Sequence, residues 1–231
     1  MKKVRRLGII QPGRIGDVII CLPIAKWYSD RGYIVVWPVI EYIEKQMKGY
    51  IDYVHFVPIA DLDCSKVRNI VYRNCNTVID LAFSFPQSTP YNDKIYAENI
   101  INKSFDEIKY EIAAVPFSEK WNLEFIRNSE AENKLFDELS PSGQYTLAHL
   151  DGSNQSCSLG SVRNAAIIVT PLTSSIFDWC KMIEQADEII AIDSCFANLV
   201  EQSGLNMKPK KLIKRTPDIR PIYRNNWEFV D

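Results

Sequence analysis

The sequence predicts an α/β protein made of two Rossmann-like halves that face a cleft. Short apolar runs alternate with helix-length segments along most of the 231 residues, which is typical of βαβ units and parallel sheets. The first apolar run leads through a glycine loop directly into a helical pattern, as it does in open α/β sheets. The alternation stops at a break, Pro141-Ser142-Gly143, and then resumes, so we expect one half on each side of it.

The N-terminal half, residues 1–140, alternates apolar runs with helical segments. Its predicted strands are Val4–Ile10, Ile34–Val39, Tyr53–Ile59 and Thr77–Phe83. Helices are predicted over Val18–Ser29, Ile40–Lys48, Asp61–Asn74, Asp93–Ala114 and Ser129–Leu139. Asp61 is the expected N-cap of the third of these helices, and the fourth is expected to run without interruption.

The C-terminal half, residues 141–216, repeats the pattern with shorter elements. Its predicted strands are Tyr145–Leu150, Ala165–Val169, Asp187–Ile192 and Lys211–Lys214. Two helices are predicted, namely Ile176–Gln185, which Ser175 caps, and Phe196–Ser203, which Gly204 closes. We expect a last segment, residues 217–231, to return to the N-terminal half.

The composition is that of an ordinary globular chain. It has 46% hydrophobic and 24% charged residues and a net charge of −2, which excludes a strong general attraction to nucleic acid or to an anionic membrane. No apolar run approaches the ~20 residues that span a bilayer, so we expect no transmembrane segment. The cysteines include no CxxC pair, and no acidic pair or histidine cluster suggests a metal site. We expect a cytoplasmic protein, which could also work peripherally at the inner membrane face.

A glycine loop follows the first predicted strand, where Gly13, Arg14 and Gly16 precede Asp17. Glycines let backbone N–H groups approach an anion, and the first turn of the following helix adds unpaired donors. A carboxylate at a helix start repels phosphate, so Asp17 suits the transfer of a proton better than the binding of an anion. The alternative is that Asp17 only caps the helix.

Small polar residues follow three predicted strands of the C-terminal half. They are Ser153 and Asn154, then Thr170–Ser175, then Asp193 and Ser194. Ligands of open parallel sheets bind beyond the carboxyl ends of the strands, so these loops suit a nucleotide whose phosphates meet hydroxyls and helix N-termini. The alternative is that each of these residues caps the helix that follows it.

Two segments carry a family resemblance. Pro12–Pro23, PGRIGDVIICLP, resembles the Gly-x-x-Gly-Asp opening of the heptosyltransferase-like family of GT-B glycosyltransferases. Leu172–Leu199 resembles the second signature of that family, in which a strand ends in Asp-Ser/Thr-Gly and a histidine follows a few residues on. The resemblance implies a GT-B-like fold and a glycosyltransferase that moves a sugar from a nucleotide-sugar donor to an acceptor hydroxyl. It implies no cofactor and no metal.

The resemblance also assigns roles to residues. Asp17 matches the catalytic carboxylate, a general base that takes the acceptor proton while the hydroxyl attacks the anomeric carbon. Other matched residues would bind the donor, with its sugar and diphosphate at Asp193, Ser194, Cys195 and Asn198 and its base at Leu172, Thr173 and Ser174. We expect the donor site to include further residues, namely Gly13, Arg14, Gly16, Ser153 and Asn154.

The chain departs from the family pattern at three places. Cys195 stands where glycine is usual, Asn198 stands where histidine is usual, and the loop Ser153–Gly160 has no lysine for the donor. Arg163 or a residue of the basic C-terminal stretch could replace that lysine. These departures leave a non-catalytic nucleotide- or glycan-binding protein as the alternative. A dinucleotide-dependent oxidoreductase is disfavoured, because the loop lacks the G-x-G-x-x-G pattern.

The basic stretch Lys208–Arg224 bears on the acceptor. Its charge would attract the donor diphosphate or a phosphorylated acceptor, so the acceptor could be a glycan, a lipid-linked sugar or modified DNA. The alternative is that the stretch is only a solvated surface segment. The histidines, His55 and His149, lie in apolar strand patterns and are expected in the core.

Overall fold

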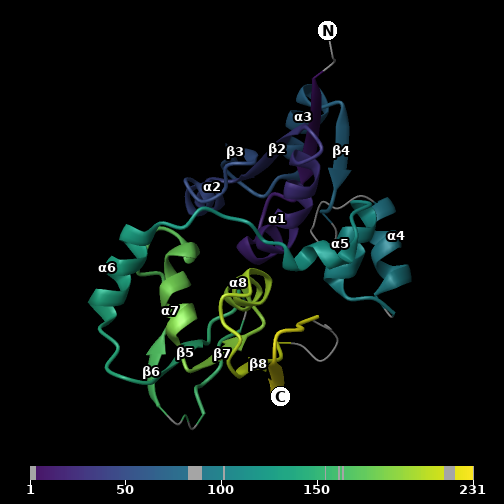
Figure 1. Cartoon of the computed structure of the whole chain (residues 1–231). Helices are drawn as coiled ribbons and strands as arrows, with labels where there is room; N and C mark the ends of the chain where they lie inside the picture. The colour runs from purple at the N-terminus through teal and green to yellow at the C-terminus, as the bar shows by residue number, and fades with distance from the viewer. Residues whose placement is uncertain are drawn as a thin grey trace. The chain divides into compact units, whose positions relative to one another are not determined.

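The structure, a computed structural model, describes residues 4–82, 90–100, 102–153, 155–160, 162, 164–215 and 222–230. The chain divides into two compact units, Met1–Phe125 and Ile126–Asp231. Each unit is built on a parallel sheet of its own with helices packed on it (Figure 1). The predicted fold class, an α/β chain with two Rossmann-like parallel sheets, is therefore confirmed.

The first unit holds, within its described part, a four-stranded sheet in the order β3-β2-β1-β4. Its strands are β1 (Arg5–Ile10), β2 (Tyr33–Ile40), β3 (Val54–Ile59) and β4 (Thr77–Asp80), and all neighbours are parallel. The last four residues of β1 are buried, as expected of an inner strand that is covered on both faces. The carboxyl ends of parallel strands lie at one edge of a sheet, so the loop after β1 begins at the edge where ligands usually bind.

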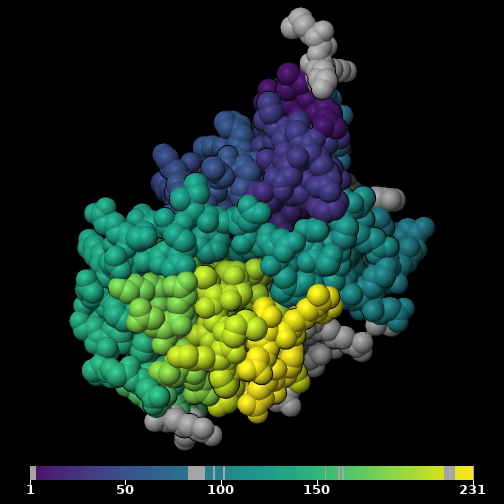
Figure 2. Space-filling view, in the orientation of Figure 1, coloured from purple at the N-terminus to yellow at the C-terminus, as the bar shows by residue number. Residues whose placement is uncertain are grey.

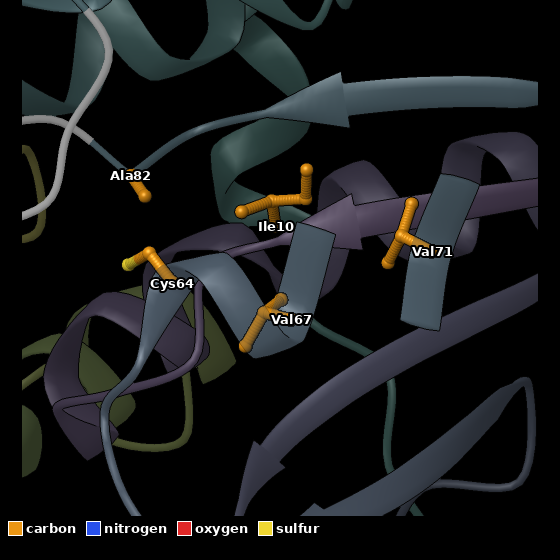
Figure 3. Packing of buried hydrophobic residues seen from close by; sticks show 5 residues of the cluster. All are labelled: Ile10, Cys64, Val67, Val71 and Ala82. Atoms are coloured by element: carbon orange, nitrogen blue, oxygen red, sulfur yellow. The ribbon is translucent and has the colours of Figure 1, made fainter. Parts of the chain in front are cut away.

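Helices connect and cover these strands. They are α1 (Ile15–Ser29), α2 (Glu41–Met47), α3 (Cys64–Asn74), α4 (Pro90–Asn99), α5 (Phe105–Ile112) and the 3-10 helix η1 (Phe117–Trp121). Figure 3 shows how α3 packs its apolar residues against the end of β1 in a buried cluster of Ile10, Cys64, Val67, Val71 and Ala82. A Cβ atom on Gly8 would lie 2.2 Å from Val71 Cγ1, so this close approach of helix to strand requires glycine.

The second unit holds, among its described residues, a five-stranded sheet in the order β6-β5-β7-β8-β9. The strands are β5 (Tyr145–His149), β6 (Ala165–Ile168), β7 (Glu188–Ile192), β8 (Lys210–Ile213) and β9 (Trp227–Val230), again all parallel. The helical segments are α6 (Ser129–Leu139), η2 (Ile176–Trp179), α7 (Cys180–Gln185) and α8 (Cys195–Ser203). Strand β9 forms an exposed edge, and its residues are the yellow end of the chain in Figure 2.

Two of the predicted helical segments have an N-cap at an unexpected residue. The segment predicted as one helix, Asp93–Ala114, forms α4 and α5. Ser104 breaks it, because the Ser104 hydroxyl accepts a hydrogen bond from the Glu107 N–H while the Glu107 carboxylate accepts one from the Ser104 N–H, a capping box that starts a new helix. Helix α3 begins at Cys64, and its cap is Asp63 instead of Asp61.

The division between the units also lies earlier than the expected linker at residue 140. Helix α6 packs against η2 and α7 of the second unit. Arg127, just before α6, pairs with Glu132 of α6 and with Glu184 of α7, the latter at 2.8 Å. Within the described end of the chain, Trp227–Val230 extend the second sheet as β9, parallel to β8. No helix of the described ranges is long and apolar enough to cross a membrane.

Candidate functional site

The carboxylate that the sequence singles out lies near the start of α1. The helix begins at Ile15 after Arg14, whose φ of 32° is unusual for a residue with a side chain. Asp17 is the third residue of the helix, and no side-chain hydrogen bond caps this helix. The alternative interpretation of Asp17 as the cap is therefore wrong. Its charge still lies in the first turn, where the helix dipole favours an anion.

A buried lysine contacts Asp17. Lys109 of α5 has a fully buried side chain, and its Nζ lies 3.6 Å from Asp17 Oδ1. The same ammonium donates to Gln11 Oε1 at 2.6 Å and to the Leu81 carbonyl at 3.2 Å, so it joins the loops after β1 and β4. Lys109 was not predicted from the sequence, because nothing local marks a lysine whose partner Gln11 is 98 residues away.

The surroundings of Asp17 push the pKa of its carboxyl in two directions. Burial raises the pKa above its usual value, and the nearby charges of Lys109 and Arg14 oppose that shift. Asp106, which pairs with the buried Lys120, adds a smaller upward contribution to the pKa. The net rise in the pKa brings Asp17 closer to the range in which a carboxylate is an effective general base.

The loop before α1 is held by its own packing. A Cβ atom on Gly13 would lie 2.0 Å from Leu62 Cδ2, the end of a flexible side chain that is 42% exposed, so the Leu62 side chain covers the loop at Gly13. Gln11 supports the loop, since its side chain donates to the Gly13 carbonyl at 2.8 Å. Gly13 is thus buried under Leu62, whereas Arg14 is exposed and Gly16 is partly buried in the first turn of α1.

In the second unit, the predicted residues after β7 form the start of α8. Ser194 is the N-cap of α8, and Cys195 is the first helical residue. Burial raises the pKa of the Cys195 thiol to about 11, so this side chain is uncharged at neutral pH. Asn198 donates from its amide to the Ser194 carbonyl at 3.0 Å. The Asn198 Oδ1 atom is buried without a hydrogen-bond partner within the described part of the chain.

His149 lies at this site and not in the core interior. It ends β5, its Nδ1 is 3.1 Å from Ser194 Oγ, and its ring stacks on Phe196 with the centroids 5.3 Å apart. Burial lowers the pKa of its imidazole, with a smaller opposing effect of Asp151, so the ring is mainly neutral at pH 7. The sequence held a signal for this role, because His149 is a polar residue at the end of an apolar strand, just before Asp151 and Gly152.

An arginine that follows β8 reaches the loop after β5. Arg215 follows β8, and its guanidinium donates to Ser153 Oγ at 3.2 Å. A Cβ atom on Gly152 would lie 3.4 Å from Arg215 Cδ and 3.5 Å from Ile192 Cδ1, the last residue of β7. Because β7 lies between β5 and β8, the Arg215 side chain extends across the carboxyl end of β7. Asn154 and Arg163, which the sequence analysis named, are outside the described residues.

The remaining predicted residues follow β6. Thr173 donates from its hydroxyl to the Ser175 carbonyl at 2.9 Å, and Ser175 caps η2. Leu172 and Ser174 are exposed. The structure thus joins Ser194 to His149 and Asn198, and Ser153 to Arg215, while Leu172–Ser174 lie at the carboxyl end of the edge strand β6. Across the described ranges, no group of three or more histidine, cysteine or acidic residues could hold a metal ion.

No family model matches the sequence, and no curated protein matches it. The fold, however, matches solved structures. The whole chain matches a glycosyl transferase family 9 structure from Veillonella parvula DSM 2008 with a TM-score of 0.68 and 10% identity, over 88% of that chain. Similarly, 97% of the chain matches the E. coli heptosyltransferase WaaC with ADP-2-deoxy-2-fluoro heptose, with a TM-score of 0.52 and 12% identity, over 92% of that chain.

A third match is the E. coli ADP-heptose lps heptosyltransferase II, with a TM-score of 0.53 and 8% identity, over 98% of this chain and 90% of that one. The resemblance seen in the sequence is thereby confirmed at the level of the fold. The chain has the GT-B-like fold of these glycosyltransferase structures.

Proposed function

We propose that this protein is a glycosyltransferase that moves a sugar from a nucleotide-sugar donor to an acceptor hydroxyl. The observation that carries the proposal is a largely enclosed carboxylate, Asp17, which contacts the buried Lys109 directly after the β1 loop in a chain that shares its fold with heptosyltransferases. A carboxylate with a raised pKa in that loop suits the acceptance of a proton. The first unit would bind the acceptor, and the second unit would bind the donor.

The proposed reaction is a direct displacement. Asp17 takes the proton of the acceptor hydroxyl while the hydroxyl oxygen bonds to the anomeric carbon of the donor sugar. The bond between that carbon and the diphosphate oxygen breaks, and the nucleoside diphosphate leaves with its electron pair. The N-terminus of α8 and the Arg215 guanidinium would stabilise the charge on the leaving group, so the reaction would need no metal ion.

The neighbours suggest which donor to test first. One matched structure is a heptosyltransferase with ADP-2-deoxy-2-fluoro heptose and another is an ADP-heptose heptosyltransferase, so we propose an ADP-sugar as donor. The acceptor would be a glycan, a lipid-linked sugar or modified DNA. A thermal-shift screen with ADP-heptose, ADP and other nucleotide sugars tests the proposal, because a ligand at 100 times its Kd adds about 2.7 kcal/mol of stability. The absence of any stabilisation by these compounds would contradict it.

The second candidate function is a non-catalytic nucleotide- or glycan-binding protein. Two departures from the family pattern favour it, because the Cβ of Cys195 restricts the backbone where glycine is usual and Asn198 cannot carry the charge of a histidine. Such a protein would bind a nucleotide sugar and release no nucleoside diphosphate in the presence of acceptors. Release of ADP from ADP-heptose in the presence of an acceptor panel therefore separates the two functions.

Replacing Asp193 or Ser194 with alanine is expected to weaken the binding of ADP-heptose, since both side chains lie at the start of α8. The Ser194→Ala variant should also lose about 1 kcal/mol of stability, because it removes the helix cap. Isothermal titration and thermal unfolding measure the two effects. Unchanged affinity in both variants would place the donor elsewhere.

Replacing Arg215 with glutamine is expected to raise the Kd for ADP about tenfold, the loss that follows removal of one charge-assisted hydrogen bond. The affinity of the variant should also depend less on salt, because salt no longer screens an attraction between the Arg215 guanidinium and the diphosphate. Titration with ADP at low and high salt measures both effects. The matched control is Lys211→Gln, since Lys211 lies in β8 and its Nζ pairs with Glu188 Oε1 at 2.8 Å, at the opposite end of β7 from Arg215. Equal losses in the two variants would argue against a site at Arg215.

A further inference from the structure

Residues 222–227, which lead into β9 and include its first residue, form a strap that a buried carboxylate anchors. Glu201 of α8 is fully buried. Its Oε1 accepts a hydrogen bond from the Arg224 N–H at 2.6 Å, and its Oε2 accepts from the Asn225 N–H at 3.3 Å and from Trp227 Nε1 at 2.8 Å. One carboxylate thus binds two backbone groups and one side chain of the strap, which holds the strap in one place on the helix.

The strap carries a tyrosine to the candidate donor site. The Tyr223 hydroxyl donates to Asp193 Oδ1 at 3.0 Å. The Tyr223 ring packs edge-on against Trp227, with the ring centroids 5.2 Å apart, and Trp227 is the residue that Glu201 holds. A chain of contacts therefore runs from the buried Glu201 through Trp227 and Tyr223 to the Asp193 carboxylate.

The strap contacts the side chain of Asp193, a residue whose backbone is already held by the sheet. The Asp193 N–H donates to the Ile213 carbonyl at 3.1 Å, which continues the pairing of β7 with β8. This bond sets the backbone of Asp193 but leaves its side-chain torsions open. The hydrogen bond from Tyr223 restricts those torsions and so helps to orient the carboxylate at the carboxyl edge of the sheet.

We propose that Tyr223 is a positioning residue that holds Asp193 for the sugar part of the donor. The inference rests on the proposed function, to which it adds a positioning residue and a basis for selectivity among donor sugars. A carboxylate repels the diphosphate, whereas it accepts hydrogen bonds from sugar hydroxyls. Asp193 would therefore contribute to affinity for the sugar and not for the nucleotide. This contribution requires that the Asp193 carboxylate keep its orientation. Selectivity among donor sugars depends on the strap.

The test compares two ligands in one variant. Tyr223→Phe keeps the ring that packs on Trp227 and removes only the hydroxyl that Asp193 accepts from. We expect its Kd for ADP-D-β-D-heptose to rise about tenfold, the effect of an unmade hydrogen bond to a charged group. The Kd for ADP should change by less than about twofold, since ADP has no donor sugar. Isothermal titration of wild type and variant with both ligands gives the two ratios.

Tyr145→Phe is the matched control. It removes a phenol hydroxyl from the same unit, one that donates to the Met182 carbonyl at 2.7 Å in the interior. This variant should lose stability and keep the wild-type ratio of the two Kd values. An unchanged ratio in Tyr223→Phe, or an equal loss for both ligands, would overturn the role of Tyr223 while leaving the proposed function intact. Failure of the wild type to bind any nucleotide sugar would overturn both.

Discussion

Replacing Asp17 with asparagine is expected to lower kcat for sugar transfer by about 10²–10⁴-fold, the usual contribution of a general base. Asparagine keeps the size of the side chain and its place in the first turn of α1, but it cannot accept the acceptor proton. The Kd for the donor should change little, because the donor site is proposed in the second unit. Turnover and melting temperature of both proteins, measured where both are folded, check this result.

Asp187→Asn is a suitable control for the Asp17 variant. Asp187 precedes β7, so it lies at the amino end of that strand, opposite the candidate donor site, and pairs with Lys208 at 3.0 Å. Loss of such a partly exposed pair costs ~0–1 kcal/mol and should leave turnover unchanged. Near-wild-type turnover in Asp17→Asn would remove Asp17 from the mechanism and favour the binding protein as the function.

Replacing the buried Lys109 with methionine is expected to destabilise the first unit by about 3–5 kcal/mol at a pH where Asp17 is ionised, because one partner of a buried pair remains without the other. The loss should depend on pH. Lys109 lowers the pKa of Asp17, so its removal raises that pKa further above the unfolded value of about 3.9. Between these two pKa values the folded state keeps a proton that the unfolded chain releases, and stability therefore falls as pH rises through this window.

Urea unfolding of the wild type and of Lys109→Met at pH 5 and pH 8 measures this dependence, and the variant should lose more stability at the higher pH. The double variant Asp17→Asn with Lys109→Met removes the unpaired carboxylate. It should be more stable at pH 8 than the single Lys109→Met variant and show a smaller change with pH. A loss of stability that is the same at both pH values would show that Lys109 acts through packing and not through Asp17.

Much of the fold could be predicted, because it depends on local patterns. The apolar runs mark the strands since inner strands of parallel sheets are buried on both faces. Gly204 closes α8 with a φ of 62°, as its position after the helical pattern predicted. The break before α5 was also visible in principle, because Ser104 and Glu107 have the spacing of a capping box. Strand β9 was missed, since four largely exposed residues give no such pattern.

By itself, the sequence determined the alternation of strands and helices and two polar segments, one at Asp17 and one at Asp193 and Ser194, because a strand, its loop and the next helix are contiguous in the chain. Only the tertiary structure decided which side chains act on these segments. Lys109 reaches Asp17 from α5, His149 reaches Ser194 from 45 residues away, and Tyr223 reaches Asp193 from 30 residues away. The physical reason is that a charge or a hydrogen bond acts through distance in space, and the packing of distant segments sets that distance.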